Sequence, residues 1–246
     1  MPLPIEELGQ VMDDEKLTTH VDMLIYCRSG GGKTYRTSSA PGPIYLATPD
    51  LTGHKSYPYK VQGKVVRRLD DLREVLEGFQ EGGHGFKTLV IDGLTFLHDM
   101  YVREMGQYWV DHMGAKDPDL LPINARQKIL ARYKDRLRDF IDLTQVENPK
   151  DRVHVIFTTL EDERTQDEGA LFQTRPLFGT KSMNQEFPAL FSTIAYIRPV
   201  GKFENGKVDP AREMFFAEIN GIMARDKLGI FAPHYSNAPE LKDYLS

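Results

Sequence analysis

Hydrophobic residues gather in short runs that alternate with stretches of helical spacing. Four nearly continuous apolar runs predict buried strands at Val21–Tyr26, Pro43–Thr48, Thr88–Asp92 and Val153–Thr159. Continuous apolar runs are typical of strands that are covered on both faces of a sheet. The pattern therefore predicts an α/β fold with a mostly parallel sheet flanked by helices.

Three segments between and after these runs carry apolar residues three or four positions apart, which predicts a helix with one buried face in each. They lie around residues 69–79, 94–108 and 125–141. Two further runs, Thr193–Val200 and Glu213–Ile219, predict a C-terminal β-hairpin, and their connection contains the turn signal Asn205-Gly206. The polar segment from Leu171 to Phe187 is rich in turn-forming residues and is expected to be a mobile loop.

Length and composition fit one globular domain. The chain has 246 residues, of which 40% are hydrophobic and 27% charged. We expect one domain over residues 1–246, with a flexible segment at residues 1–18. No apolar run approaches the ~18–20 residues that span a bilayer, so no membrane partner is expected. The acidic N-terminal residues and the single cysteine, Cys27, favour the cytoplasm.

The segment after the first predicted strand has the spacing of a phosphate-binding loop. It follows the pattern G-x-x-x-x-G-K-[ST] over residues 27–34, with Cys27 in place of the first glycine. Glycines permit a tight turn whose N–H groups point at phosphates, and the helix that follows adds a partial positive charge. The expected ATP-binding residues are Ser29, Gly30, Gly31, Gly32, Lys33, Thr34 and Tyr35.

A second motif supports this interpretation. Thr88–Asp92 is an apolar strand that ends in a carboxylate about sixty residues after the loop. In P-loop proteins such an aspartate and the loop hydroxyl, here Thr34, hold Mg²⁺, while the loop lysine, here Lys33, contacts the β- and γ-phosphates. Asp92 and Thr34 are therefore the predicted metal residues.

Hydrolysis also needs a group that orients the attacking water. Gly93 occupies the position beside Asp92 where many ATPases carry a glutamate. The candidates are therefore Asp50, after the second strand, and Glu161, after the fourth. Thr158 and Thr159 end the fourth strand, where a polar residue often senses the γ-phosphate. The predicted catalytic set is Lys33, Asp92, Asp50 and Glu161.

With these motifs in place, the chain resembles the phage-encoded RecA-like ATPases of the AAA family, some of which are implicated in single-strand annealing and recombination. The resemblance covers the chain from about Val21 to Leu245. Beyond the two motifs it rests on the looser pieces Val155–Glu161, Pro176–Lys181 and Ala224–Gly229. It implies a homo-oligomer in which a neighbouring subunit completes each ATP site. Candidates for the cation that acts in trans are Arg175, Lys181, Arg225 and Lys227.

The third helix carries a candidate surface for single-stranded DNA. Only one acid, Asp135, interrupts its basic residues Arg126, Lys128, Arg132, Lys134, Arg136 and Arg138. The net charge of the chain is −5, which lowers the expectation of tight DNA binding by a monomer.

Three functions stay open on the sequence: a RecA-like ATPase of phage DNA recombination, annealing or replication, a nucleoside or nucleotide kinase, and a non-catalytic ATP-binding loader or accessory protein. If the protein is phage-encoded, its compartment is the cytoplasm of the infected host. Sheet order separates the first two functions. Kinases place the P-loop strand beside the aspartate strand, whereas RecA-like ATPases insert one strand between them. We expect Val153–Thr159 to lie between Val21–Tyr26 and Thr88–Asp92.

Overall fold

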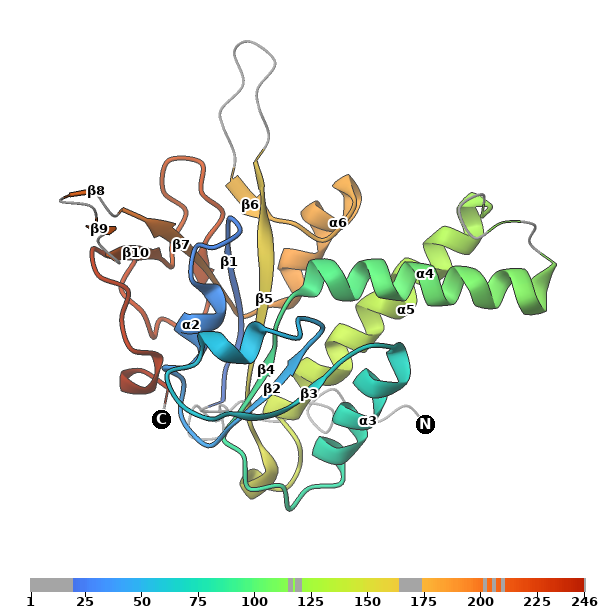
Figure 1. Ribbon diagram of the computed structural model, residues 1–246, viewed down its shortest axis with the longest axis horizontal. Coiled ribbons are helices and arrows are strands. Elements are labelled where there is room, and N and C mark those ends of the chain that lie inside the picture. The colour runs from blue at the N-terminus through green and yellow to red at the C-terminus, as the bar shows by residue number, and fades with distance from the viewer. Residues whose placement is uncertain are drawn as a thin grey trace, which may run out of the picture.

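A mostly parallel sheet forms the centre of the protein, shown in Figure 1 as a computed structural model. The structure describes residues 20–114, 117, 121–163, 174–200, 203–204, 207–208 and 211–245. The expectations of a flexible segment at residues 1–18 and of a turn at Asn205-Gly206 fall outside these residues.

The four apolar runs all form strands of the central sheet. They are β1 (Asp22–Cys27), β2 (Ile44–Thr48), β4 (Thr88–Ile91) and β5 (His154–Glu163). These strands pair in parallel in the order β1-β5-β4-β2, so β5 separates β1 from β4. The predicted strand order is therefore confirmed. The edge strand β3 (Gln62–Val65) was not predicted, because its residues are exposed or half-buried and form no apolar run.

The C-terminal part extends the sheet on the other side of β1. β7 (Thr193–Pro199) pairs with β1 in parallel, and β10 (Arg212–Phe215) pairs with β7 in antiparallel fashion. The predicted C-terminal hairpin is therefore present, although its second strand is shorter than expected. Four two-residue strands complete this region: β8 (Phe203–Glu204), β9 (Lys207–Val208), β11 (Arg225–Asp226) and β12 (His234–Tyr235).

Helices flank the sheet, as predicted. The long ones are α3 (Leu69–Gln80), α4 (Leu94–Met113) and α5 (Ile123–Ile141), and the short α2 (Lys33–Thr37) follows β1. α4 and α5 pack against each other and extend as an arm to the right of the body in Figure 1. In the described part of the chain, no helix is both long and apolar enough to cross a bilayer.

The segment expected to be a mobile loop is folded wherever the structure describes it. It forms β6 (Thr174–Pro176), which pairs with β5, and α6 (Lys181–Glu186), followed by the 3₁₀ turn η6 (Phe187–Leu190). Phe178, Met183 and Phe187 are buried and tie the segment to the core. Three apolar side chains spaced four or five residues apart among polar neighbours make no recognisable run, so the pattern alone missed them. Residues 171–173 lie outside the described part.

Candidate nucleotide-binding site

The glycine-rich loop runs from the end of β1 to the start of α2. Gly30 and Gly32 have φ angles of 73° and 95°, a left-handed region that glycine enters without the steric penalty of a side chain. The Gly31 amide donates to the Arg28 carbonyl oxygen at 3.1 Å, which closes the turn. The glycines are therefore required by the backbone at these positions.

Cys27 replaces the first glycine of the pattern because β1 continues through it. Its thiol is buried beneath the loop, and a Cβ on Gly31 would lie 2.4 Å from the Cys27 sulfur. Burial raises the pKa of this thiol, against the opposing effect of the nearby Lys33 ammonium. The Cys27 thiol thus occupies the space that a side chain at position 31 would need. The turn of the loop begins only at Arg28.

Lys33 lies across the loop that precedes it. Its Nζ donates to the carbonyl oxygens of Cys27 at 3.1 Å and of Arg28 at 3.3 Å. The ammonium group is therefore held beside the loop, at the position from which a P-loop lysine reaches the β- and γ-phosphates.

Thr34 and Asp92 meet at the carboxyl ends of β1 and β4. The Thr34 hydroxyl lies 3.1 Å from Oδ1 and 3.0 Å from Oδ2 of Asp92. Thr158 donates to Oδ1 and accepts a hydrogen bond from the Gly93 amide at 3.0 Å. Burial raises the pKa of Asp92, although these two hydroxyl donors and the charge of Lys33 oppose that effect.

This pair of residues fits Mg²⁺. A hydroxyl and a carboxylate are hard oxygen ligands, and Mg²⁺ is usually bound by one or two carboxylates with substrate phosphates and waters. Among the described residues, no group of three or more His, Cys, Asp or Glu side chains is placed to hold a metal. Thr34 and Asp92 would therefore supply the protein oxygens, and phosphate and water the rest.

A cavity of about 180 Å³ opens beside these residues, at the edge where the parallel strands end. Its described lining consists of Ser29, Gly30, Lys33, Thr34, Thr48, Pro49, Asp50, Asp92, Gly93, Thr95, Phe96, Thr158, Thr159 and Leu160. Among the predicted loop residues, Tyr35 projects from α2 with 49% of its surface exposed. The sequence analysis missed Thr48, Thr95 and Phe96; a search of the residues next to each strand end would have found them.

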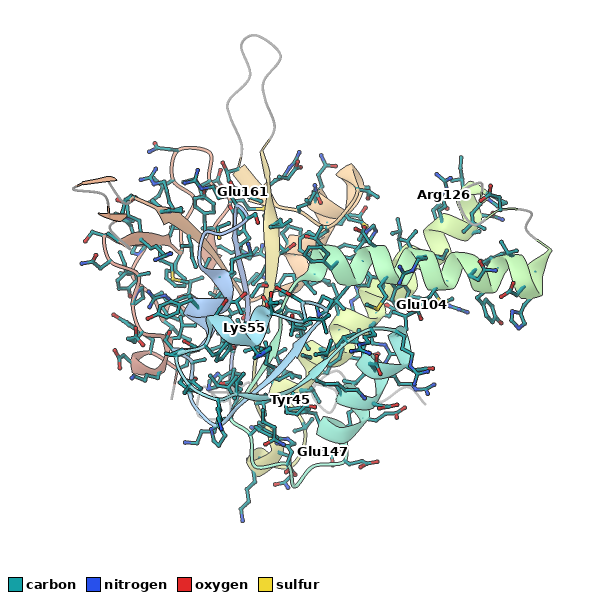
Figure 2. All side chains as sticks on the ribbon, viewed as in Figure 1. Tyr45, Lys55, Glu104, Arg126, Glu147 and Glu161 are labelled. Carbon is teal, nitrogen blue, oxygen red and sulfur yellow. The ribbon has the colours of Figure 1, made fainter. Side chains whose placement is uncertain are left out.

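The two candidate bases are placed differently. Asp50 lines the cavity, and its carboxylate accepts hydrogen bonds from the amide and hydroxyl of Thr52, which lower its pKa. Glu161 lies higher on β5 (Figure 2), close enough to Tyr26 and Cys27 for its charge to raise the pKa of both. The described lining of the cavity includes Leu160 but not Glu161. Of the two carboxylates, the structure brings only Asp50 to the site.

Gly93 explains the missing glutamate beside Asp92. Its φ is 94°, and it precedes the first turn of α4. A side chain at this position would be strained. The backbone that leads from β4 into α4 therefore disfavours a catalytic carboxylate here.

Thr159 connects the cavity to the segment around β6. Its hydroxyl donates to the Leu177 carbonyl oxygen at 2.5 Å and lies 3.0 Å from the hydroxyl of Thr95. Thr95 and Thr159 both line the cavity. The hydroxyl groups of Thr95 and Thr159 thus form a hydrogen-bonded path from the cavity wall to Leu177, which lies between β6 and α6.

The candidate cations for trans action differ in exposure. Arg175 is 6% exposed and pairs with Asp162 at 3.4 Å, and Arg225 donates to the carbonyl oxygens of Pro188 and Phe191. Both guanidinium groups would have to leave these contacts to reach another subunit. Lys227 is exposed. Lys181 begins α6, and its side chain lies outside the described structure.

The basic residues of α5 do not share one face. Lys134 reaches Glu186 of α6 at 3.6 Å, whereas Lys128 lies 5.7 Å from the centre of the Trp109 ring on α4. Acids of the same helix pair with two others, as Arg136 does with Asp139 and Arg138 with Asp135. Arg126 and Arg132 are exposed, with Arg126 far out on the arm (Figure 2). The expected single basic track is therefore divided and partly neutralised.

Arg212 is a residue of this site that the sequence analysis missed. It begins β10, and its Nε donates to the Gly31 carbonyl oxygen at 2.9 Å. The contact joins residues 181 positions apart in the chain. No local pattern could have indicated it, because it depends on how the hairpin of β7 and β10 pairs with β1.

The fold and this loop define the class: a parallel sheet with a phosphate-binding loop after its central strand, in a P-loop nucleotide-binding protein. The sequence model of the AAA domain family (AAA_24) matches residues 19–223. The chain therefore belongs to the AAA domain family and is a P-loop ATPase domain of AAA type. No curated protein sequence matches it significantly.

Proposed function

We propose that this protein binds ATP with Mg²⁺ and hydrolyses it through a RecA-like arrangement of the core. The observation that carries the proposal is the convergence of Lys33, Thr34 and Asp92 on one cavity, although they come from two separate motifs. The insertion of β5 between β1 and β4 supports an ATPase and argues against the kinase alternative.

Each residue has a distinct part in this proposal. Lys33 places a positive charge beside the β- and γ-phosphates. Thr34 and Asp92 hold Mg²⁺, which neutralises developing negative charge on the phosphates when it is bound. Because hydrogen bonds from Thr52 lower the pKa of Asp50, that carboxylate is ionised at neutral pH. We assign Asp50 the orientation of the attacking water.

The strand between the two motifs provides a sensor. Thr158 is bound to Asp92, and Thr159 lines the cavity while it bonds to the Leu177 carbonyl oxygen. A γ-phosphate in the cavity competes for these hydroxyl groups. When the γ-phosphate leaves after hydrolysis, the bond between Thr159 and Leu177 changes, and the segment between β6 and α6 shifts.

The resemblance to RecA-like ATPases adds two further parts to the proposal. The protein forms a homo-oligomer in which either Lys227, which is exposed, or Lys181 approaches the ATP of a neighbour. It acts on single-stranded DNA in phage recombination, annealing or replication, with the exposed Arg126 and Arg132 of α5 as the phosphate contacts. The second part rests on the resemblance more than on the divided charges of α5.

The test is phosphate release from ATP, measured with Mg²⁺ or EDTA and with or without single-stranded DNA. We expect Mg²⁺-dependent release that DNA accelerates. Release that DNA leaves unchanged would contradict the DNA role but not the ATPase. Tight ATP binding without turnover would favour the non-catalytic loader. Phosphate transfer to a nucleoside or nucleotide in place of water would favour the kinase.

A further inference from the structure

The Gly31 carbonyl of the glycine-rich loop contacts an arginine from β10, which is separated from β1 by one strand, β7. Arg212 Nε donates to the Gly31 carbonyl oxygen at 2.9 Å. The same nitrogen lies 2.5 Å from the point that a Cβ on Gly32 would occupy. Arg212 is therefore packed against the Gly31–Gly32 peptide. This packing requires glycine at position 32, because a Cβ there would collide with the guanidinium group.

Sheet topology brings this arginine to the loop. β10 runs antiparallel to β7, and Arg212 is paired with Pro199 at the carboxyl end of β7. β7 in turn lies parallel to β1, so the end of β7 and the loop after β1 meet at the same edge. The position of Arg212 thus follows from strand pairing.

The geometry of the peptide bond fixes what this contact does. A trans peptide is planar, and its C=O and N–H point in opposite directions. Because the Gly31 carbonyl oxygen is directed at Arg212, the N–H of Gly32 points to the opposite side, away from the arginine. In a P-loop, N–H groups at these positions face the phosphates.

We propose that Arg212 is a positioning residue for phosphate binding, which holds the Gly31–Gly32 peptide with the Gly32 N–H directed at the nucleotide phosphates. This inference rests on the proposed ATP site. It also assigns the C-terminal hairpin a part in nucleotide affinity, because any displacement of β10 moves the loop.

The surrounding charges agree with an anion at this loop. Arg36 on α2 is close enough to Arg212 for the second positive charge to lower its pKa, in addition to the larger effect of burial. Two guanidinium groups that repel each other gain from a nearby phosphate charge. Arg36 is itself held by the Pro239 carbonyl oxygen and by Glu240, so Arg212 is the one of the two that reaches the loop carbonyl.

The experiment compares Arg212→Met, which keeps the aliphatic stem, with Arg212→Lys, which keeps the charge. The dissociation constant of a fluorescent ATP analogue is measured directly, and that of inorganic tripolyphosphate by competition. We expect Arg212→Met to weaken both ligands about tenfold, the size of a lost hydrogen bond to a charged group. Arg212→Lys should recover part of the loss. The melting temperature without nucleotide should change by less than about 3 °C, since a half-exposed contact is lost.

Arg198→Met is the matched control. Arg198 lies on the neighbouring strand β7, and its guanidinium group pairs with Glu213 and lies over the Phe215 ring, both on β10. Its removal should leave ATP affinity within about twofold of wild type. If Arg212→Met does not fold, Arg212→Gln takes its place, with an expected loss of at least about threefold.

Two results would overturn the inference. One is ATP affinity within twofold of wild type in the folded Arg212 variant. The other is weakened ATP binding with unchanged tripolyphosphate binding, since a positioned N–H acts on phosphate and not on the base. Both results can be obtained only if the wild-type protein binds ATP. If the wild-type protein does not bind ATP, the proposed function itself is wrong. Failure of the proposed function is thus distinguishable from failure of the inference about Arg212.

Discussion

Asp92 is buried at the end of β4, and burial raises its pKa above the ordinary value of 3.8. A carboxyl group whose pKa is raised in the folded state favours the protonated form there. Its ionisation at neutral pH therefore opposes folding until a cation binds. The residue that we propose as a Mg²⁺ ligand thus lowers the stability of the folded protein in the absence of the cation.

Asp92→Asn should separate these two effects. The variant is expected to melt at a higher temperature than wild type at pH 7 without Mg²⁺, because it carries no buried charge. The difference should vanish below about pH 3.8, where the unfolded carboxyl group is protonated as well. ATP hydrolysis should fall about 100-fold or more, whereas ATP affinity should change less. Thermal unfolding and phosphate release check both, and normal hydrolysis would refute the assignment of Asp92 to the metal.

At this scale the sequence predicts residues whose role is local. The spacing of Lys33 and Thr34, and an aspartate after an apolar strand, are visible because each motif occupies a few consecutive positions. The contact of Arg212 with Gly31 is invisible in the sequence because tertiary pairing creates it. The choice between Asp50 and Glu161 also needed coordinates. Both were expected to follow strands, but β5 continues through Glu161 to Glu163, and of the two only Asp50 belongs to the described lining of the cavity.

At the scale of elements, β5 connects the nucleotide cavity to the chain between β6 and α6. Thr159→Val removes the hydroxyl and keeps the shape of the side chain. It leaves the Leu177 carbonyl oxygen without this donor, so the free energy of unfolding should fall by about 1–3 kcal/mol. We expect the rate of hydrolysis to fall about tenfold or more, with ATP affinity nearly unchanged.

Thr144→Val is the control for that variant. Thr144 of η4 (Asp142–Thr144) is equally buried, and its hydroxyl donates to the carbonyl oxygen of Ile141 at the end of α5. Neither residue belongs to the described lining of the cavity. The Thr144→Val variant should have a lower free energy of unfolding than wild type and the same rate of ATP hydrolysis. Equal rates in the two variants would remove Thr159 from the proposed sensor.

The opposite ends of β1 and β5 are joined by a buried histidine. His154 Nδ1 accepts a hydrogen bond from the Val21 amide at 3.2 Å, and burial, His20 and Lys87 lower its pKa to about 4. A histidine with a lowered pKa stays neutral in the folded state, while the unfolded chain takes up a proton below about pH 6.5. Stability contributed at this site is therefore lost as the pH falls from 6.5 to 4.

His154→Asn keeps an acceptor near the same position and does not titrate. Between pH 7 and pH 4, its free energy of unfolding should fall by about 3 kcal/mol less than that of wild type, from 1.36 kcal/mol per pKa unit. Urea denaturation over this range measures the difference. The exposed His112 of α4 provides the control His112→Asn. Parallel stability curves for wild type and His154→Asn would contradict the account.

For the whole molecule, apolar runs predicted the layers, and the resemblance to RecA-like ATPases together with chain order predicted the order of the parallel strands. These strands are buried on both faces, and their sequences show it. The edge strand β3 was missed because it has no apolar run, and the segment from β6 to η6 was missed because it is anchored by isolated side chains. Elements without an apolar run or a regular apolar spacing were therefore the part of the fold that the sequence left open.

The proposed completion of the site by a neighbouring subunit is tested on the assembled protein. If Lys227 acts in trans, hydrolysis per subunit should rise with protein concentration. Lys33→Ala and Lys227→Ala chains should each be weakly active, and their mixture should recover part of the activity. The check is phosphate release over a wide concentration range with sedimentation analysis of the same samples. Constant activity per subunit, with no recovery in the mixture, would favour a site completed within one chain.

The most direct test of the nucleotide site is phosphate release from ATP with Mg²⁺ by wild type, Lys33→Ala and Lys150→Ala. Lys33 Nζ is bonded to the loop carbonyls of Cys27 and Arg28, whereas Lys150 is exposed in η5 (Pro149–Asp151) and lies outside the described lining of the cavity. We predict hydrolysis by wild type and Lys150→Ala and a loss of about 100-fold or more in Lys33→Ala. Turnover in Lys33→Ala within a few-fold of wild type would contradict the account.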